Sequence, residues 1–457
     1  MPDLVFQPFA ELASLIRRKK LSPVELTRAC LDRIQALEPK VNAFLTVTAD
    51  LAIEQAKQAE REIRAGRYRG PLHGIPYGLK DLIATKGIRT TNGSQVTADW
   101  IPDFDATVVE RLTRAGAILA GKLNLLEFAM GSGQKGLKGP ARNPWDPAYS
   151  PSGSSSGSGA ALAAGMVPLT IGSDSGGSIR GPAKSCGVVG LKPTRDRISL
   201  HGVTTLSWTL DHLGPMARTV ADAALALQAI DTSATVPDYS KALVRHLKGV
   251  RIGVPRGYFF QHVRPETDAA LRAAMDVLKS LGAEISDLEI RQAPLFSAVS
   301  RVILSSESAA FHEQRLRASA HLLDPLVRER LEAGMFQSAV DYLRAQRIRA
   351  GLVEEMRRVF TLCDVILLPA GNAAPRLDEE TVGTDLPTNP PAAPRPDTFN
   401  LANVTGIPAI VLPCGFTPGP PVLPLGIQFC AAENGESLLF RVGHAYQSVT
   451  DWHRRHP

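Results

Sequence analysis

Hydrophobic residues near the start of the chain recur with the spacing of amphipathic helices. The run Ser22-Pro23-Val24-Glu25 is a capping box with proline at the first helical position. Apolar residues follow it at helical spacing, at Leu26, Cys30, Ile34 and Leu37. A second helix is predicted from Asp50 to about Arg64, ending at Gly66. Residues 74–81 then change to a short strand pattern broken by glycine and proline, with a lysine at its far end.

Helices and strands alternate along the rest of the chain. An amphipathic helix over residues 107–114 is closed by Gly116 and followed by an apolar strand over 117–120. This alternation is typical of α/β proteins with parallel strands. Further helices are predicted over residues 219–230, 266–281, about 337–360 and from about 436, and further strands over 250–254, 365–369, 409–413 and 425–429.

Charge and cysteine content narrow the classes of function. The net charge is only +6 over 457 residues, with no run of like charge, so no nucleic-acid partner is indicated. The five cysteines stand far apart, so neither a disulfide framework nor a zinc site is predicted. The basic run at residues 17–20 follows a mixed segment, the reverse of a secretory signal. The longest uncharged stretch, 147–173, contains too short an apolar run to span a bilayer. We therefore expect a cytoplasmic protein with no membrane partner.

Two segments imitate motifs of other enzymes. Residues 116–122 resemble a phosphate-binding loop, but Leu123 stands where that loop needs Ser or Thr to meet magnesium, which favours an ordinary turn. Residues 153–157, Gly-Ser-Ser-Ser-Gly, spell the nucleophile elbow of α/β-hydrolases with Ser155 at its centre. That motif needs a histidine partner, and no histidine lies between His73 and His201. Both matches are therefore interpreted as coincidental.

The elbow-like match lies in a run where nine of the ten residues from 150 to 159 are Ser or Gly. One interpretation is a flexible linker. However, the run passes directly into an apolar helix at 160–165, an apolar segment at 167–171, and Gly172 to Arg180, which is again rich in small residues. Small residues between core segments are expected where backbone N–H groups approach a ligand closely. This requirement accounts for part of the high glycine and proline content of the chain, which has 38 glycines and 34 prolines.

Three motifs together resemble the amidase signature family. They are Lys80 in Gly78-Leu79-Lys80-Asp81, the Ser/Gly run ending at Gly165, and Asp174-Ser175-Gly176-Gly177-Ser178-Ile179-Arg180 with the following Gly187-Val188-Val189-Gly190-Leu191-Lys192-Pro193-Thr194. Flanking segments at 127–132 and 142–146 agree. The resemblance is dense from about residue 70 to 227 and collinear over the rest.

The resemblance implies a single large α/β domain over residues 1–457, with a central mixed β-sheet covered by helices. Its catalytic core would comprise about 65–230 and 365–457, with a variable helix-rich middle over about 235–360. Composition shifts at residues 231–239 and at the proline-rich 386–396 mark surface connections at the edges of this middle part.

Such enzymes are serine hydrolases that cleave C–N acyl bonds with a Ser-cisSer-Lys triad. Aligning the motifs implies Ser178 as nucleophile, Ser154 as the serine that follows a cis peptide bond, and Lys80 as base. Ser154, rather than the elbow-like Ser155, is then catalytic. The backbone N–H groups of Ser175, Gly176 and Gly177, with that of Ser178, would form the oxyanion hole. The resemblance also places Met130, Gly131 and Ser132 in the substrate pocket and implies neither a metal nor an organic cofactor.

The chemistry of these residue types supports the assignment. A serine hydroxyl becomes a useful nucleophile only when a base accepts its proton, and a lysine can be that base if burial lowers its pKa. Each residue also has a structural interpretation. Lys80 could be a solvated lysine at a strand end, Ser178 could cap a helix beginning near Ile179, and Met130 could be core packing. Asp174 and Arg180 are expected to pair and brace the loop.

The substrate remains open at the level of sequence. Small amides, aryl acylamides, carboxybiuret-like compounds and carbamates (urethanes) all pass through the same tetrahedral chemistry. The apolar loops at 386–396 and 418–424 favour an uncharged or aromatic substrate, which points to an aryl acylamidase or a urethanase acting alone or as a homodimer. The alternative is the A subunit of a tRNA-dependent glutamine amidotransferase complex. There, an Arg-Tyr-Asp-Gly segment helps recognise glutamine, whereas this chain reads Ser305-Ser306-Glu307-Ser308-Ala309-Ala310-Phe311.

Overall fold

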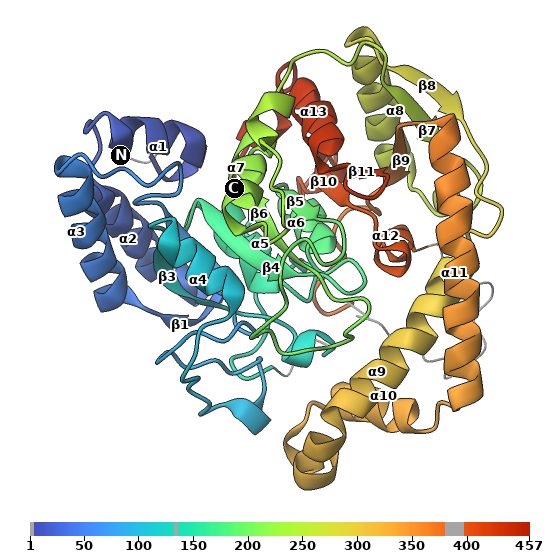
Figure 1. Cartoon of the computed structure of the whole chain (residues 1–457), viewed down its shortest axis with the longest axis horizontal. Coiled ribbons are helices and arrows are strands. Elements are labelled where there is room, and N and C mark those ends of the chain that lie inside the picture. The colour runs from blue at the N-terminus through green and yellow to red at the C-terminus, as the bar shows by residue number, and fades with distance from the viewer. Residues whose placement is uncertain (1–3, 132–135, 380–396) are drawn as a thin grey trace.

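A single mixed β-sheet runs through the molecule (Figure 1). The computed structural model describes residues 4–131, 136–379 and 397–457. Across these residues 11 strands lie in the order β1-β3-β2-β4-β6-β5-β10-β11-β9-β7-β8. Neighbouring strands pair in parallel at β2–β3, β2–β4, β7–β8 and β7–β9 and antiparallel elsewhere. The strands are β1 (Phe44–Val47), β2 (Pro76–Lys80), β3 (Ile118–Leu123), β4 (Leu169–Ser173), β5 (Val189–Lys192), β6 (Leu213–Ala217), β7 (Arg251–Val254), β8 (Glu284–Asp287), β9 (Val365–Pro369), β10 (Ala409–Phe416) and β11 (Pro424–Ala431).

Helices cover both faces of this sheet, which confirms the predicted α/β domain with a mixed sheet. No helix within the described residues is long and apolar enough to cross a bilayer. The helices are α1 (Phe9–Arg17), α2 (Pro23–Val41), α3 (Ala49–Arg64), α4 (Thr107–Arg114), α5 (Ser156–Ala163), α6 (Arg180–Cys186), α7 (Val220–Ile230), α8 (Pro265–Ser280), α9 (Leu295–Ser319), α10 (Pro325–Met335), α11 (Ala339–Leu362), α12 (Asn400–Thr405) and α13 (Glu436–Gln447).

Local sequence signals account for many of these boundaries. Helix α2 begins with the predicted capping box, in which Ser22 Oγ accepts from the Val24 N–H at 3.0 Å and Glu25 Oε2 accepts from the Ser22 N–H at 2.9 Å. The helix predicted over residues 107–114 and the strand predicted over 365–369 are observed with those same limits. The loop at 386–396, predicted as a surface connection, lies outside the described residues.

Strand β10 shows how the sheet separates two parts of the core. Successive side chains of a strand point to opposite faces. Ile410 and Leu412 pack with residues of α7 and α13, whereas Val411 between them packs with residues of α5 and α6. Helices α5 and α6, which carry the Ser/Gly motifs, therefore lie on one face at the centre of the sheet, while α7 and α13 cover the other.

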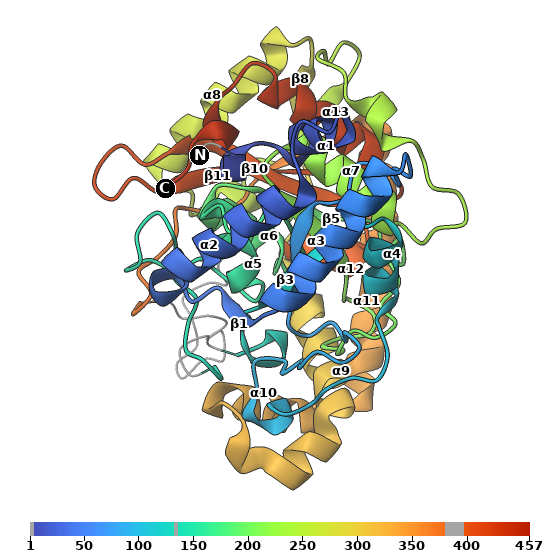
Figure 2. The same ribbon diagram turned by 90° about the vertical axis from the view of Figure 1, so that its left-hand side faces the viewer.

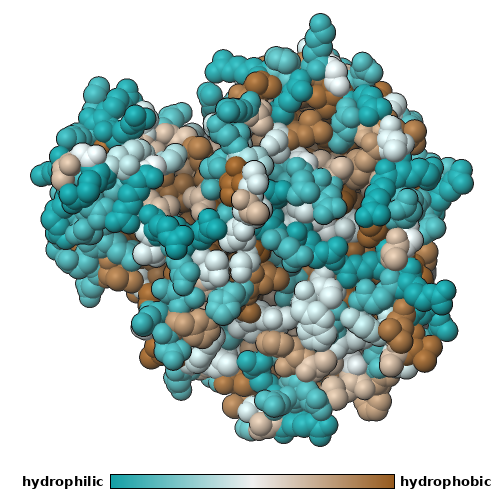
Figure 3. Space-filling view, in the orientation of Figure 1, coloured by the Kyte–Doolittle hydropathy of each residue, from teal (hydrophilic) through white to brown (hydrophobic). Residues whose placement is uncertain are grey.

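The N-terminal helices form a separate layer at one edge. Helices α2 and α3 lie side by side and pack against β3 (Figure 2). Their outer surface is largely hydrophilic (Figure 3), as expected for helices whose buried positions recur at amphipathic spacing, such as Ala52, Ala56, Ala59 and Ile63 in α3.

The middle of the chain builds a helical layer at the opposite side of the molecule. Helix α9 packs against α10, α11 and α12, and the α9–α11 pair is seen side by side in Figure 1. Apolar residues of this layer, such as Phe296 and Ile303 of α9 and Leu352 of α11, pack with Ile366 and Leu368 of β9. The helix-rich middle is thus not an appendage, because its core is continuous with the central sheet.

Candidate active site

Lys80 ends strand β2 in the interior of the molecule. Strand β2 lies between β3 and β4, and the lysine side chain has no exposed surface. Its Nζ donates to Ser154 Oγ at 2.7 Å and to Ser173 Oγ, at the end of β4, at 2.8 Å. The interpretation of Lys80 as a solvated strand-end lysine is therefore wrong.

Burial changes the acid–base character of this lysine. Removing an ammonium group from water disfavours its charged form. Desolvation lowers the pKa of Lys80 from 10.5 to about 7, although the carboxylates of Asp174 and Asp211 oppose the shift. A substantial fraction of Lys80 is then neutral near pH 7 and available to accept a proton.

Ser154 follows a cis peptide bond, Gly153–Ser154, as the resemblance implies. Glycine is required before it, because a Cβ on residue 153 would lie 2.4 Å from Leu126 Cδ1. The neighbouring Ser155 is turned elsewhere, since its Oγ donates to the Ser173 carbonyl oxygen at 3.1 Å. Helix α5 begins at Ser156 and is buried throughout. The Ser/Gly run is thus part of the core, and the linker interpretation is wrong.

Ser178 lies next to the segment that follows the cis peptide and borders an open space. The Ser155 N–H donates to the Ser178 carbonyl oxygen at 3.2 Å, which joins the two motifs. Helix α6 starts at Arg180, and no side chain caps its N-terminus within the described residues. The alternative interpretation of Ser178 as a helix cap is therefore wrong. Its partly exposed side chain instead lines a pocket of about 300 Å³ together with Ser175 and Gly176.

The loop before Ser178 is held by the Asp174 carboxylate. Its Oδ1 accepts from the Gly177 N–H at 2.7 Å and its Oδ2 accepts from the Ile179 N–H at 3.1 Å. The carboxylate also pairs with Arg180 at 3.0 Å, which confirms the predicted bracing ion pair. Burial would raise the pKa of Asp174, but the Arg180 guanidinium and the Asn403 amide lower it well below its usual value. The loop anchor is therefore ionised.

This anchoring changes which donors are available for an oxyanion. The Gly177 N–H, expected as an oxyanion donor, is already bonded to Asp174. Gly177 is needed for a different reason: its φ is +112°, and a Cβ there would lie 2.6 Å from Phe399 Cδ2. Within the described residues, the N–H groups of Ser175, Gly176 and Ser178 donate to no protein acceptor. They remain the proposed oxyanion donors.

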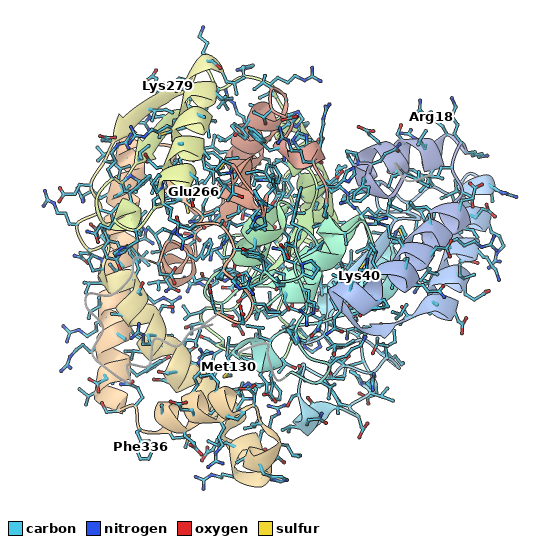
Figure 4. The ribbon with its side chains drawn as sticks, turned by 180° about the vertical axis from the view of Figure 1, so that it is seen from behind. Arg18, Lys40, Met130, Glu266, Lys279 and Phe336 are labelled. Atoms are coloured by element: carbon cyan, nitrogen blue, oxygen red, sulfur yellow. The ribbon has the colours of Figure 1, made fainter. Side chains whose placement is uncertain are left out.

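The predicted substrate-pocket segment is only partly placed at the cavity. Met130 lines the pocket and also packs in the main core cluster, so both interpretations of this residue hold. Gly131 is buried next to Glu127 and Val327 and is not among the lining residues. Ser132 lies outside the described residues. Figure 4 shows Met130 next to the α9–α10 pair.

Asp211 is a site residue that the sequence analysis missed. Ser175 Oγ donates to its Oδ1 at 2.5 Å, and its Oδ2 accepts from the N–H groups of Leu206 and Ser207 at 2.9 and 3.1 Å. Asp211 thereby links Ser175, in the loop of the proposed oxyanion donors, to the segment that contains the pocket residue Leu206. Burial raises the pKa of Asp211 to about 6, against the lowering effect of these hydrogen bonds and of Lys80.

Other residues in or near the site were not predicted. Ser173 is the second hydrogen-bond partner of Lys80. Its position directly before the Asp174 motif was the signal that could have identified it. Arg301 and Arg330 of helices α9 and α10 line the pocket, but no sequence pattern showed which face of either helix meets the core.

Lys122, the lysine of the segment that resembles a phosphate-binding loop, has a structural role. Its side chain is buried and pairs with Asp81 at 3.3 Å.

The fold, the buried Lys80–Ser154 contact and the cis peptide bond before Ser154 are those expected from the amidase signature, and the comparisons identify the family. The sequence model of the amidase family matches residues 25–440, so the chain belongs to the amidase signature family. The glutamyl-tRNA(Gln) amidotransferase A subunit of Chloroflexus aurantiacus is 40% identical over 96% of this chain and 95% of that protein.

Two solved structures extend the comparison. A chain from a vestigial protein complex, whose structure was described as revealing the evolutionary origins of an s-triazine catabolic enzyme, superposes with a TM-score of 0.88 at 33% identity, over 97% of this chain and 98% of that one. The peptide amidase of Stenotrophomonas maltophilia gives 0.85 at 29% identity, over 97% of this chain and 96% of that one. The chain is thus an amidohydrolase of the amidase signature family.

Proposed function

We propose that this chain hydrolyses the C–N acyl bond of a small substrate through an acyl-enzyme on Ser178. The observation that carries the proposal is the 2.7 Å contact between Lys80 Nζ and Ser154 Oγ, made by a buried lysine with a pKa of about 7. Such a pair can relay a proton, since a neutral amine accepts from a hydroxyl that in turn accepts from the nucleophile.

The reaction proceeds in two steps. Ser178 Oγ attacks the acyl carbon while its proton passes through Ser154 to Lys80, and the oxyanion accepts from the free N–H groups of Ser175, Gly176 and Ser178. The C–N bond breaks as the leaving nitrogen takes the proton back. Water then attacks the ester carbonyl by the same relay, releasing the acid and restoring Ser178.

The substrate expected from sequence needs revision. The preference for uncharged or aromatic compounds rested on the loops at 386–396, which lie outside the described residues, and 418–424, which do not line the pocket. The lining is mixed, with Met130, Leu206 and Leu304 beside serines and two arginines. A cavity of about 300 Å³ is at the lower end of the range for ligand sites and suits a small molecule.

A second candidate function is that of the glutamine-hydrolysing chain in an amidotransferase complex. The 40% identity over nearly the full length of such a chain supports this function more strongly than carbamate or aryl-amide cleavage. The first half-reaction would be the same, with the side-chain amide of glutamine as substrate and ammonia as leaving group. The absence of an Arg-Tyr-Asp-Gly segment at residues 305–311 weighs against it.

One set of assays tests both candidates. The purified chain is given glutamine, a small aliphatic amide, an aryl acetamide and an aryl carbamate, and the release of ammonia or arylamine is followed. Replacing Ser178 by alanine should lower turnover of any substrate by about 10³-fold or more. Turnover that survives in the Ser178→Ala protein would overturn the nucleophile assignment. Activity on glutamine alone, dependent on the other proteins of an amidotransferase complex, would favour the second candidate.

A further inference from the structure

A second cavity, of about 750 Å³, lies between helices α1, α7 and α13. It is lined by residues of the segments 6–11, 218–221, 444–448 and 453–456, together with Arg245. Helix α7 lies between α1 and α13 in Figure 1 and packs against both. Among the described residues, none lines both this cavity and the Ser178 pocket. The reaction proposed above therefore makes no use of it.

Positive charge dominates the lining of this cavity. Arg218, Arg245 and Arg454 contribute three guanidinium groups. Glu11 is the one carboxylate among the described lining residues. No ion pair joins any of these four side chains to another group in the described part of the chain. Burial and the nearby Arg454 lower the pKa of His453 to about 4, so this imidazole is neutral at pH 7 and the arginines supply the charge.

Arg218 is held rigidly in the wall of the cavity. It is only 7% exposed. Its Nη1 donates to the carbonyl oxygen of Leu162 at 2.5 Å and its Nη2 to that of Val5 at 2.8 Å. The guanidinium carbon lies 5.1 Å from the centroid of the Phe6 ring. Its Nε, however, has no hydrogen-bond partner among the described residues.

The carboxylate of Asp222 does not neutralise this arginine by contact. Burial lowers the pKa of Arg218 to about 10, and the charge of Asp222 opposes that shift, so the guanidinium is protonated at pH 7. The Asp222 oxygens accept from the N–H groups of Phe9 and Ala10 at 3.1 and 2.9 Å, and this carboxylate does not line the cavity. The wall of the cavity thus contains a buried cation with an unused donor.

Gln447 brings a second donor without a partner. Its Oε1 accepts from the Val220 N–H at 2.8 Å, and because that group can only donate, the contact fixes the orientation of the amide. Its Nε2 has no hydrogen-bond partner among the described residues, and Gln447 is 7% exposed. Buried donors are nearly always paired, since an unpaired one costs free energy. Two such donors beside one positive cavity indicate an anionic ligand that is rich in acceptor oxygens.

We propose that this cavity is a second binding site, for a small phosphate monoester, held by Arg218 and Gln447 in its wall. The exposed Arg245 and Arg454 complete the site on its solvent side. A phosphate group presents three oxygens and up to two negative charges, so it suits several guanidinium and amide donors better than a carboxylate does. The volume of about 750 Å³ also has room for the organic part of such a molecule.

Calorimetric titration of the full chain tests the site. Glycerol 3-phosphate is the probe, with glycerol and acetate as comparisons, in about 150 mM salt so that weak surface attraction is screened. The phosphate should bind at one site per chain, at least about tenfold more tightly than acetate, and glycerol should not bind. Arg245→Gln and Arg454→Gln should each weaken it about tenfold, because each removes a charge-assisted contact. No binding up to about 10 mM phosphate, or unchanged binding in the double variant, would overturn the proposal.

A charge-matched control separates a site from general attraction. Arg18, at the end of α1 (Figure 4), does not line the cavity. Arg18→Gln removes the same charge from the same side of α7 and should change the binding constant by less than about twofold. An equal loss in Arg18→Gln and Arg454→Gln would overturn the proposal, because binding would then follow the total charge of the protein.

Two further titrations define the ligand and the buried donor. Gln447→Glu keeps an acceptor for the Val220 N–H but places an acidic group beside the phosphate, so a folded variant should lose at least about tenfold in affinity. Unchanged affinity would overturn the role of Gln447. A single-stranded oligonucleotide that binds more tightly than glycerol 3-phosphate would overturn the small-molecule assignment. None of these measurements requires turnover of an amide, so their outcome is independent of the proposed function.

Discussion

The Nζ atom of Lys80 lies 2.7 Å from Ser154 Oγ in a site with no exposed lysine surface. The contact joins the end of strand β2 to the loop before helix α5, two segments separated by 74 positions in the chain. A buried lysine without a carboxylate partner in direct contact is expected to lose its proton more easily than one in water. The proposed proton path therefore rests on this contact.

The pH dependence of activity should report the ionisation of Lys80. The base must be neutral, and its pKa is about 7, so kcat/KM should rise with pH through 7 and level off above about 8. At pH 6 it should be about tenfold below the plateau. Lys80→Arg should remove this activity, because a guanidinium stays protonated. A flat profile between pH 5.5 and 8, or an active Lys80→Arg protein, would show that another group is the base.

Replacing Asp211 should move that profile in a defined direction. The negative charge of Asp211 raises the pKa of Lys80. Asp211→Asn removes the charge, so the pKa of Lys80 falls and the acidic limb of the kcat/KM profile shifts to lower pH, even where the plateau is reduced by looser packing of Ser175. The shift is read from profiles of both proteins in the same buffers. A limb that moves to higher pH would mean that Asp211 does not act on Lys80 through its charge.

Two adjacent serines should differ sharply in their effect on activity. Ser154→Ala removes the relay hydroxyl and should lower kcat by about 10²- to 10⁴-fold. Ser155→Ala removes a hydroxyl that donates to the Ser173 carbonyl oxygen, which should cost about 0.5–1.5 kcal/mol of unfolding free energy and little activity. Activity and urea denaturation are measured for both variants. Comparable losses of kcat would refute the distinction between relay and structural serine.

Ser152 should be a site of easy stabilisation. Its φ is +63°, in the left-handed region that favours glycine. Ser152→Gly should raise the unfolding free energy by about 0.5–1 kcal/mol, because the gain from removing Cβ exceeds the added entropy of the unfolded chain. The control is Ser156→Gly, within helix α5, which should not stabilise. Equal stabilisation by both changes, measured by urea denaturation, would argue against the backbone explanation.

Local patterns predicted those elements whose signals lie within a few residues. The capping box of α2, the amphipathic spacing of α4 and the apolar run of β9 each specify an element without reference to the rest of the chain. Helix α9 was not delimited, because its buried positions include the polar residues Ser300, Glu307 and His312, which interrupt the apolar pattern. The start of α5 was placed late because serine and glycine are poor helix formers that only the surrounding core keeps helical.

The sequence by itself determined the family and the proposed chemistry, because the motifs around Lys80, Ser154 and Ser178 are short runs whose residue types such a reaction would require. The tertiary structure alone decided the environment of that chemistry. The burial that lowers the pKa of Lys80, the engagement of the Gly177 N–H by Asp174 and the two arginines beside Ser178 all arise from contacts between segments distant in the chain. Such contacts depend on which faces of helices and strands meet, and local sequence patterns do not specify this.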